Sequence, residues 1–159
     1  MSCPSSRTPT LQPAHDPAAL AEALISVAER SFFAFAELAP ADQPVLASDG
    51  WYQASVSFRG RFSGSVTLTM PVGLARDLWA SFLGLEPDVA PDEVAICDLI
   101  GEIANMACGS WLTGRLEASC FELLHPDVRR VDAAPAGDVV VMVNDQPVVV
   151  VLRIAPGDR

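Results

Sequence analysis

Residues 91–114 read PDEVAICDLIGEIANMACGSWLTG, and this stretch says more about the fold than any other part of the chain. Proline suits the first turn of a helix and glycine the position just beyond its end, so Pro91 and Gly114 bound a predicted helix over about 91–114. Most of its other residues are apolar. Those expected to face a core are Val94, Cys97, Ile100, Ile103, Ala104, Ala107 and Trp111.

Four residues of this helix share one narrow stripe, because each residue advances about 100° around the axis. They are Asp98, Glu102, Asn105 and Gly109. Asn is a poor residue for a helix interior and Gly costs about 1 kcal/mol relative to Ala, so a purely solvated face would favour other residues. Acidic and amide side chains on a helix are nevertheless often only solvated. The spacing alone leaves both interpretations open.

The segments on either side predict an α+β fold, with helices packed on an antiparallel-rich β-sheet. Asp16-Pro17 is a helix start, Gly84 a helix end, and alternating β-formers mark the strands. The predicted helices span 17–38 and 72–84, and the predicted strands span 51–58, 62–70, 119–124, 139–143 and 147–154. The run Val148 to Val151 indicates a strand that is covered on both faces or that pairs in an interface.

The composition predicts one domain over residues 16–159, preceded by a disordered Ser- and Pro-rich arm over residues 1–15. The net charge is −10 and all ten basic residues are Arg, which argues against nucleic-acid binding. No apolar run approaches the roughly 18 residues of a membrane span. Four cysteines without a Cys-x-x-Cys pair favour the reducing cytoplasm.

The segment from Asp98 to Gly109 resembles the signature helix of the CheX and CheC chemotaxis phosphatases, whose motif is Glu-x-x-Asn followed by a small-residue turn. The preceding hairpin with Phe62 to Leu68, the Met70-Pro71 pair and the next helix also follow the order of the CheX family. The resemblance spans roughly 16–114 well and the C-terminal strands loosely. CheC-type relatives carry two such motifs, whereas the first predicted helix here has none, which favours CheX.

This resemblance implies an aspartyl-phosphate phosphatase that acts on the phosphorylated receiver domain of a CheY-like response regulator. Asn105 matches the amide that positions the attacking water, and an amide can both donate and accept hydrogen bonds. Glu102 matches the acid that pairs with the receiver's active-site Lys, while Asp98 and Gly109 flank the pair as docking positions. The Mg²⁺ is supplied by the partner, and this chain is expected to bind no metal or other cofactor.

The resemblance also implies a homodimer that pairs sheets between subunits, here expected to use the apolar strand 147–154. An alternative function is a non-catalytic module that binds a receiver or a flagellar switch component without accelerating hydrolysis. The presence of both Glu102 and Asn105 argues against it.

Two other patterns are interpreted as structural. Glu122 and His125 have Glu-x-x-His spacing, but a di-iron site would need two such motifs and further carboxylates. The tripeptide His125-Pro126-Asp127 is interpreted as a turn after a strand.

Overall fold

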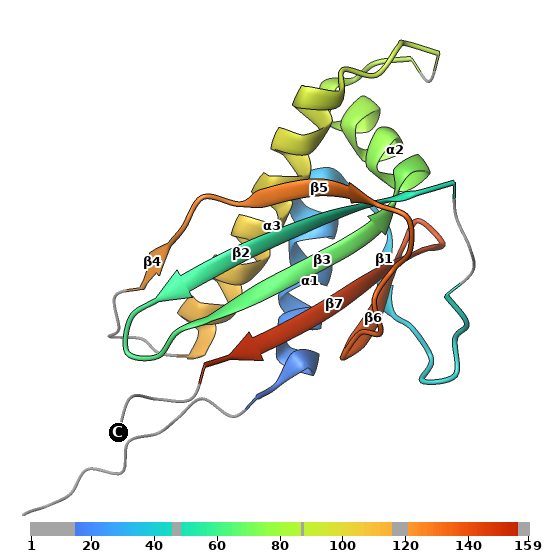
Figure 1. Ribbon diagram of the computed structural model, residues 1–159. Helices are drawn as coiled ribbons and strands as arrows, with labels where there is room; N and C mark the ends of the chain where they lie inside the picture. Colours follow the sequence, from blue (N-terminus) through green and yellow to red (C-terminus); the bar gives the residue numbers. More distant parts are fainter. Residues whose placement is uncertain (1–14, 46–48, 87, 116–120, 156–159) are drawn as a thin grey trace, which may run out of the picture.

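The computed structural model describes residues 15–45, 49–86, 88–115 and 121–155. Within these ranges three helices pack on a seven-stranded antiparallel sheet, which confirms the predicted α+β class (Figure 1). In chain order the elements are α1 (Pro17–Phe32), β1 (Ala36–Leu38), β2 (Trp51–Arg59), β3 (Gly64–Pro71), α2 (Val72–Leu83), α3 (Glu93–Arg115), β4 (Glu122–Leu123), β5 (Asp127–Val131), β6 (Val139–Val143) and β7 (Gln146–Ile154).

The strands lie in the order β1-β6-β7-β3-β2-β4, and β5 also pairs with β2. Every pairing is antiparallel. The strands β2 and β3, and likewise β6 and β7, form hairpins that are closed by short turns. Asn144 and Asp145 form the β6–β7 turn with positive φ angles of 47° and 63°, as a two-residue hairpin requires. The predicted strands 51–58, 139–143 and 147–154 thus correspond closely to β2, β6 and β7.

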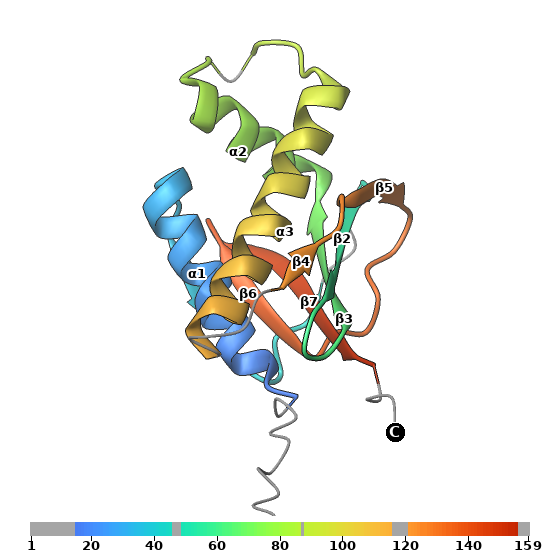
Figure 2. The ribbon, with the colours of Figure 1, turned by 90° about the vertical axis from the view of Figure 1, so that its left-hand side faces the viewer.

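The core lies between one face of the sheet and the helices, which Figure 2 shows on a single side of the strands. Alternate residues of the central strands point into it, including Val66 and Leu68 of β3 and Val150 of β7. The opposite face is also covered at β7, because Gly137 packs directly on Val149, which is 1% exposed. This two-sided burial explains the continuous valine run of β7.

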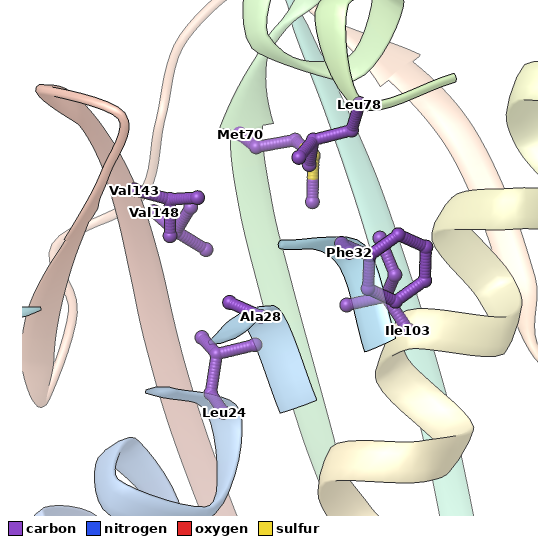
Figure 3. A pocket seen from close by; sticks show the side chains of 8 residues that line it. All are labelled: Leu24, Ala28, Phe32, Met70, Leu78, Ile103, Val143 and Val148. Carbon is purple, nitrogen blue, oxygen red and sulfur yellow. The ribbon is translucent and has the colours of Figure 1, made fainter. Parts of the chain in front are cut away.

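The core contains one very small apolar void between α1, α2, α3 and the sheet (Figure 3). Its volume of about 10 Å³ is close to that of one water-sized probe, so it has no room for a ligand. It is lined by Leu24, Ala28, Phe32, Met70, Leu78, Ile103, Val143 and Val148.

The first helix is shorter than the predicted range 17–38. It ends at Phe32 because Phe33 adopts the left-handed region at φ 52°, and the N–H of Ala34 then donates to the Ala28 carbonyl at 3.1 Å. The chain turns into β1, which pairs with β6. No glycine marks this helix end, and Pro40 is the first local stop signal after it.

Other boundaries differ by one or two residues. The hairpin strand predicted over 62–70 begins at Gly64, and the helix predicted over 91–114 begins at Glu93 because Asp92 is its N-cap. Within that helix Val94 is 71% exposed, which corrects its predicted place in the core. The possible strand 119–124 is reduced to β4 where it is described; residues 116–120 lie outside the described part.

The strand expected to pair between subunits, 147–154, is not an edge strand, since β7 lies inside the sheet between β6 and β3. Beyond the end of β6, side chains replace a neighbouring strand: the Leu152 N–H donates to Asp138 Oδ2 at 2.8 Å, and His15 Nε2 donates to the Leu152 carbonyl at 2.9 Å. The other residues of the predicted arm 1–15 lie outside the described part of the chain.

Candidate functional site

The N-terminus of α3 is fixed to the sheet by a small polar network. The Asp92 side chain caps the helix by accepting from the N–H of Val94 at 3.1 Å. Tyr52 Oη donates to Glu93 Oε1 at 3.0 Å, and Arg130 Nη1 lies 3.6 Å from the same oxygen. Burial and this hydrogen bond raise the pKa of Tyr52, which keeps the phenol a donor. The network ties α3 to β2 and β5.

Along its length α3 is the central helix, packed against α1, α2 and the sheet. Its buried side chains are Ile96, Leu99, Ile100, Ile103, Ala104, Ala107, Cys108, Trp111 and Leu112. This wide apolar surface leaves a narrow open face. The rotation of the helix is therefore set by the core, and the polar residues on the open face have fixed positions.

The open face carries the four residues predicted from the sequence. Asp98 and Glu102 are exposed, whereas Asn105 and Gly109 are half-buried. Glu102 and Asn105 are three residues apart on the helix, so their side chains are neighbours on its surface. None of the four points into the apolar core.

Asn105 differs from an ordinary surface amide. Its Oδ1 is buried and has no hydrogen-bond partner among the described residues. Leaving a buried acceptor unpaired costs about 1–3 kcal/mol, so such groups are rare in native structures and often mark functional positions. The Oδ1 atom is thus enclosed by protein atoms, while the Asn105 side chain as a whole is half-buried and lines a groove.

A second wall faces α3 across an open groove, as the lining residues show. It is formed by the segment between β4 and β5 together with the first residues of β5, and Figure 2 shows β4 beside α3. The groove has a volume of about 490 Å³ and is lined by Cys97, Asp98, Gly101, Glu102, Asn105, His125, Pro126, Asp127 and Val128. Gly109 is not part of this lining; a Cβ there would lie 3.7 Å from Leu123.

Sequence reasoning missed this second wall. His125-Pro126-Asp127 was interpreted only as a turn, and it does connect two strands, but it also lies against the Glu102 and Asn105 face. Gly101 makes the approach possible, because a Cβ there would lie 3.2 Å from Pro126 Cγ and 3.4 Å from Val128 Cγ2. A glycine inside the predicted helix, next to the Glu-x-x-Asn motif, was the available sequence signal.

The chemistry of the groove is that of hydrogen bonding and charge rather than nucleophilic attack. Burial raises the pKa of the Cys108 thiol to about 12, and burial followed by the carboxylates of Glu93 and Asp98 raises the pKa of Cys97. A raised pKa disfavours the nucleophilic thiolate at both cysteines, of which only Cys97 lines the groove. The described residues contain no cluster of three His, Cys, Asp or Glu side chains that could hold a metal ion. Among the described helices, none is long and apolar enough to cross a membrane.

The two glycines of α3 should respond oppositely to added side chains. We expect Gly101→Val to lower the free energy of unfolding by about 1–3 kcal/mol, because the new side chain would collide with Pro126 and Val128. Gly109→Ala is the control, because the added Cβ would make an ordinary van der Waals contact with Leu123. This variant should raise the free energy of unfolding by up to about 1 kcal/mol. Urea denaturation measures both. Equal stabilities for the two variants would contradict the close packing of the second wall.

Comparisons with known proteins agree with this geometry. A CheX protein from Vibrio vulnificus has a similar fold, with a TM-score of 0.68 and 18% identity over 86% of this chain and 94% of that one. The CheX of the Borrelia burgdorferi CheX-CheY-BeF3-Mg²⁺ complex matches with a TM-score of 0.61 and 15% identity over 87% and 96% of the two chains. Thermotoga maritima FliY matches with a TM-score of 0.56 and 14% identity over 88% of this chain and 85% of that one. No curated protein matches the sequence.

These likenesses show that the chain shares the α+β fold of the CheX and FliY structures. The family described as chemotaxis phosphatase CheX matches residues 52–137, which include the hairpin, the α3 motif and the second wall. The chain belongs to the CheX family.

Proposed function

We propose that this protein accelerates hydrolysis of the phospho-aspartate of a CheY-like response regulator. The observation that carries the proposal is the Glu-x-x-Asn pair of α3, which lines an open groove, and in which the buried amide oxygen of Asn105 has no hydrogen-bond partner among the described residues. A complex of CheX with CheY, BeF3 and Mg²⁺ from Borrelia burgdorferi supports a receiver as the partner.

In this reaction the oxygen of a water molecule attacks phosphorus and the bond to the receiver's aspartate oxygen breaks. The products are inorganic phosphate and the free carboxylate, and the water's proton leaves with phosphate or solvent. Asn105 holds the water in line through its amide, which needs no strong base because the transition state is loose. Glu102 pairs with a receiver Lys and fixes the docking register. Asp98 and Gly109 are proposed docking positions at either end of the motif.

The proposal assigns Mg²⁺ to the receiver and no cofactor to this chain. The named Borrelia complex is consistent with Mg²⁺ in such an assembly. We also propose a cytoplasmic protein, supported by the free thiols of Cys97 and Cys108.

Phosphate release from a panel of the source organism's phosphorylated receivers, with and without the protein, tests the function and identifies the partner. Faster release from at least one receiver is expected. Binding to a receiver without faster release would replace the phosphatase with the non-catalytic binding module.

We further propose a homodimer. Both edges of β7 are occupied, but β1 lies at one end of the sheet, where Phe35 and Leu38 are 61% and 52% exposed. A second copy that paired there would cover an edge strand and these apolar side chains. Sedimentation at micromolar concentration should show a dimer that Leu38→Asp converts to monomer. A wild-type monomer under these conditions would contradict it.

A further inference from the structure

The segment between β4 and β5 contains a β-bulge. Phe58 of β2 pairs with Leu123, and Ser55 pairs with Asp127. Three steps along β2 therefore face four steps along the other strand, which leaves one extra residue around His125 and Pro126. Bulges are common next to active sites, where they redirect a side chain. Here the bulge directs this segment to α3, where His125 lines the groove with Glu102 and Asn105.

The bulge packs against α3 at the level of Gly101. Pro126 fills the space that a side chain at Gly101 would need, with its Cγ 3.2 Å and its Cβ 3.3 Å from the Cβ position of that glycine. Gly101 immediately precedes Glu102 in the motif. The second wall is consequently locked in register with the residues proposed to dock and to orient water.

The ring of His125 is oriented by the backbone of the next residue, Pro126. Its Nδ1 lies 2.8 Å from the Pro126 carbonyl oxygen, which can only accept, so Nδ1 carries a proton and donates. Nε2 is then the nitrogen left for another partner, and the side chain is exposed. This is the arrangement in which one nitrogen positions the ring and the other makes a contact.

His125 is also chemically distinct within the groove. The charged residues among the described lining are Asp98, Glu102 and Asp127, all acidic, and His125 is the one side chain there that can carry positive charge. Carboxylates repel a phosphorylated surface, whereas the imidazole carries no negative charge. With Nδ1 donating to the Pro126 carbonyl, Nε2 accepts a hydrogen bond when the ring is neutral and donates one when the ring is charged.

We propose that His125 is a specificity-determining contact, whose Nε2 hydrogen-bonds to a polar group of the receiver beside its phosphorylated aspartate. This inference rests on the proposed receiver partner. It assigns one wall of the groove to recognition, in addition to the Glu102 and Asn105 wall.

Two substitutions distinguish the contributions of the two ring nitrogens of His125. His125→Asn keeps a donor near the Nδ1 position but removes the atom at Nε2, and His125→Gln keeps a polar atom near Nε2. Titration with the beryllofluoride-activated receiver should give a Kd about tenfold higher for H125N and a much smaller rise for H125Q. Glu122→Gln, exposed on β4 and outside the groove lining, is the control and should bind as the wild type does.

The maximal rate of phosphate release by H125N should stay within about twofold of the wild-type rate, because the lost hydrogen bond acts in docking. Equal Kd values for H125N and the wild type would overturn the proposal, as would equal losses in both variants, which would indicate a structural role. Failure of the proposed function is a different result, since there the wild type itself neither binds nor accelerates any receiver.

Discussion

Asn105→Ala is expected to abolish the accelerated dephosphorylation while the fold remains intact. Removing one oriented hydrogen-bonding group from a reaction site typically costs about 10²–10³-fold in rate, and here the amide is the proposed water-positioning group. The variant also removes a buried acceptor that has no partner among the described residues, and Ala is the better helix former. Phosphate release at saturating receiver measures the effect.

Binding and stability serve as the controls for Asn105→Ala. Its Kd for the activated receiver should change little, and its urea midpoint should equal or exceed the wild-type value. Ser110→Ala, an exposed position on the same helix outside the groove lining, should keep the full rate. Wild-type turnover by the Asn105 variant would show that the amide does not position the water.

Glu102→Ala is expected to act through affinity. The carboxylate is exposed in the free protein and is proposed to meet a receiver Lys in a desolvated interface. Truncating one partner of such a pair costs about 2 kcal/mol or more, which is about 30-fold in Kd. The concentration of protein needed for half-maximal phosphate release should rise by this factor.

Glu102→Gln sharpens this test because it keeps the shape and removes the charge. If the anion is what the receiver recognises, the Gln variant should lose most of the same affinity. A lower maximal rate with an unchanged half-saturating concentration would assign Glu102 to the chemical step and contradict the docking role.

The sequence predicted the parts of the fold that local patterns specify. The period-two alternation identified β2, and the runs of β-formers identified β6 and β7. The α3 stripe was identified because the apolar positions around it left one face for polar residues, and the structure leaves that face open.

The missed features depend on contacts between distant segments. Leu38 continues the apolar spacing of the predicted helix 17–38. It nevertheless belongs to the short strand β1, because β1 pairs with β6. Asp127–Val131 has a weak strand pattern of its own and becomes β5 by pairing with β2. The second wall of the groove requires this pairing, the bulge and the packing of Pro126 on Gly101 together, and no window of sequence contains all three.

The most direct test of the phosphatase assignment is phosphate release from a phosphorylated receiver in large molar excess over this protein. The account predicts that a small amount of wild-type protein releases phosphate from the whole receiver pool faster than the receiver's own decay, and that an equal amount of Asn105→Ala does not. Release at the receiver's own rate in both samples, for every receiver that binds the protein, would contradict the account.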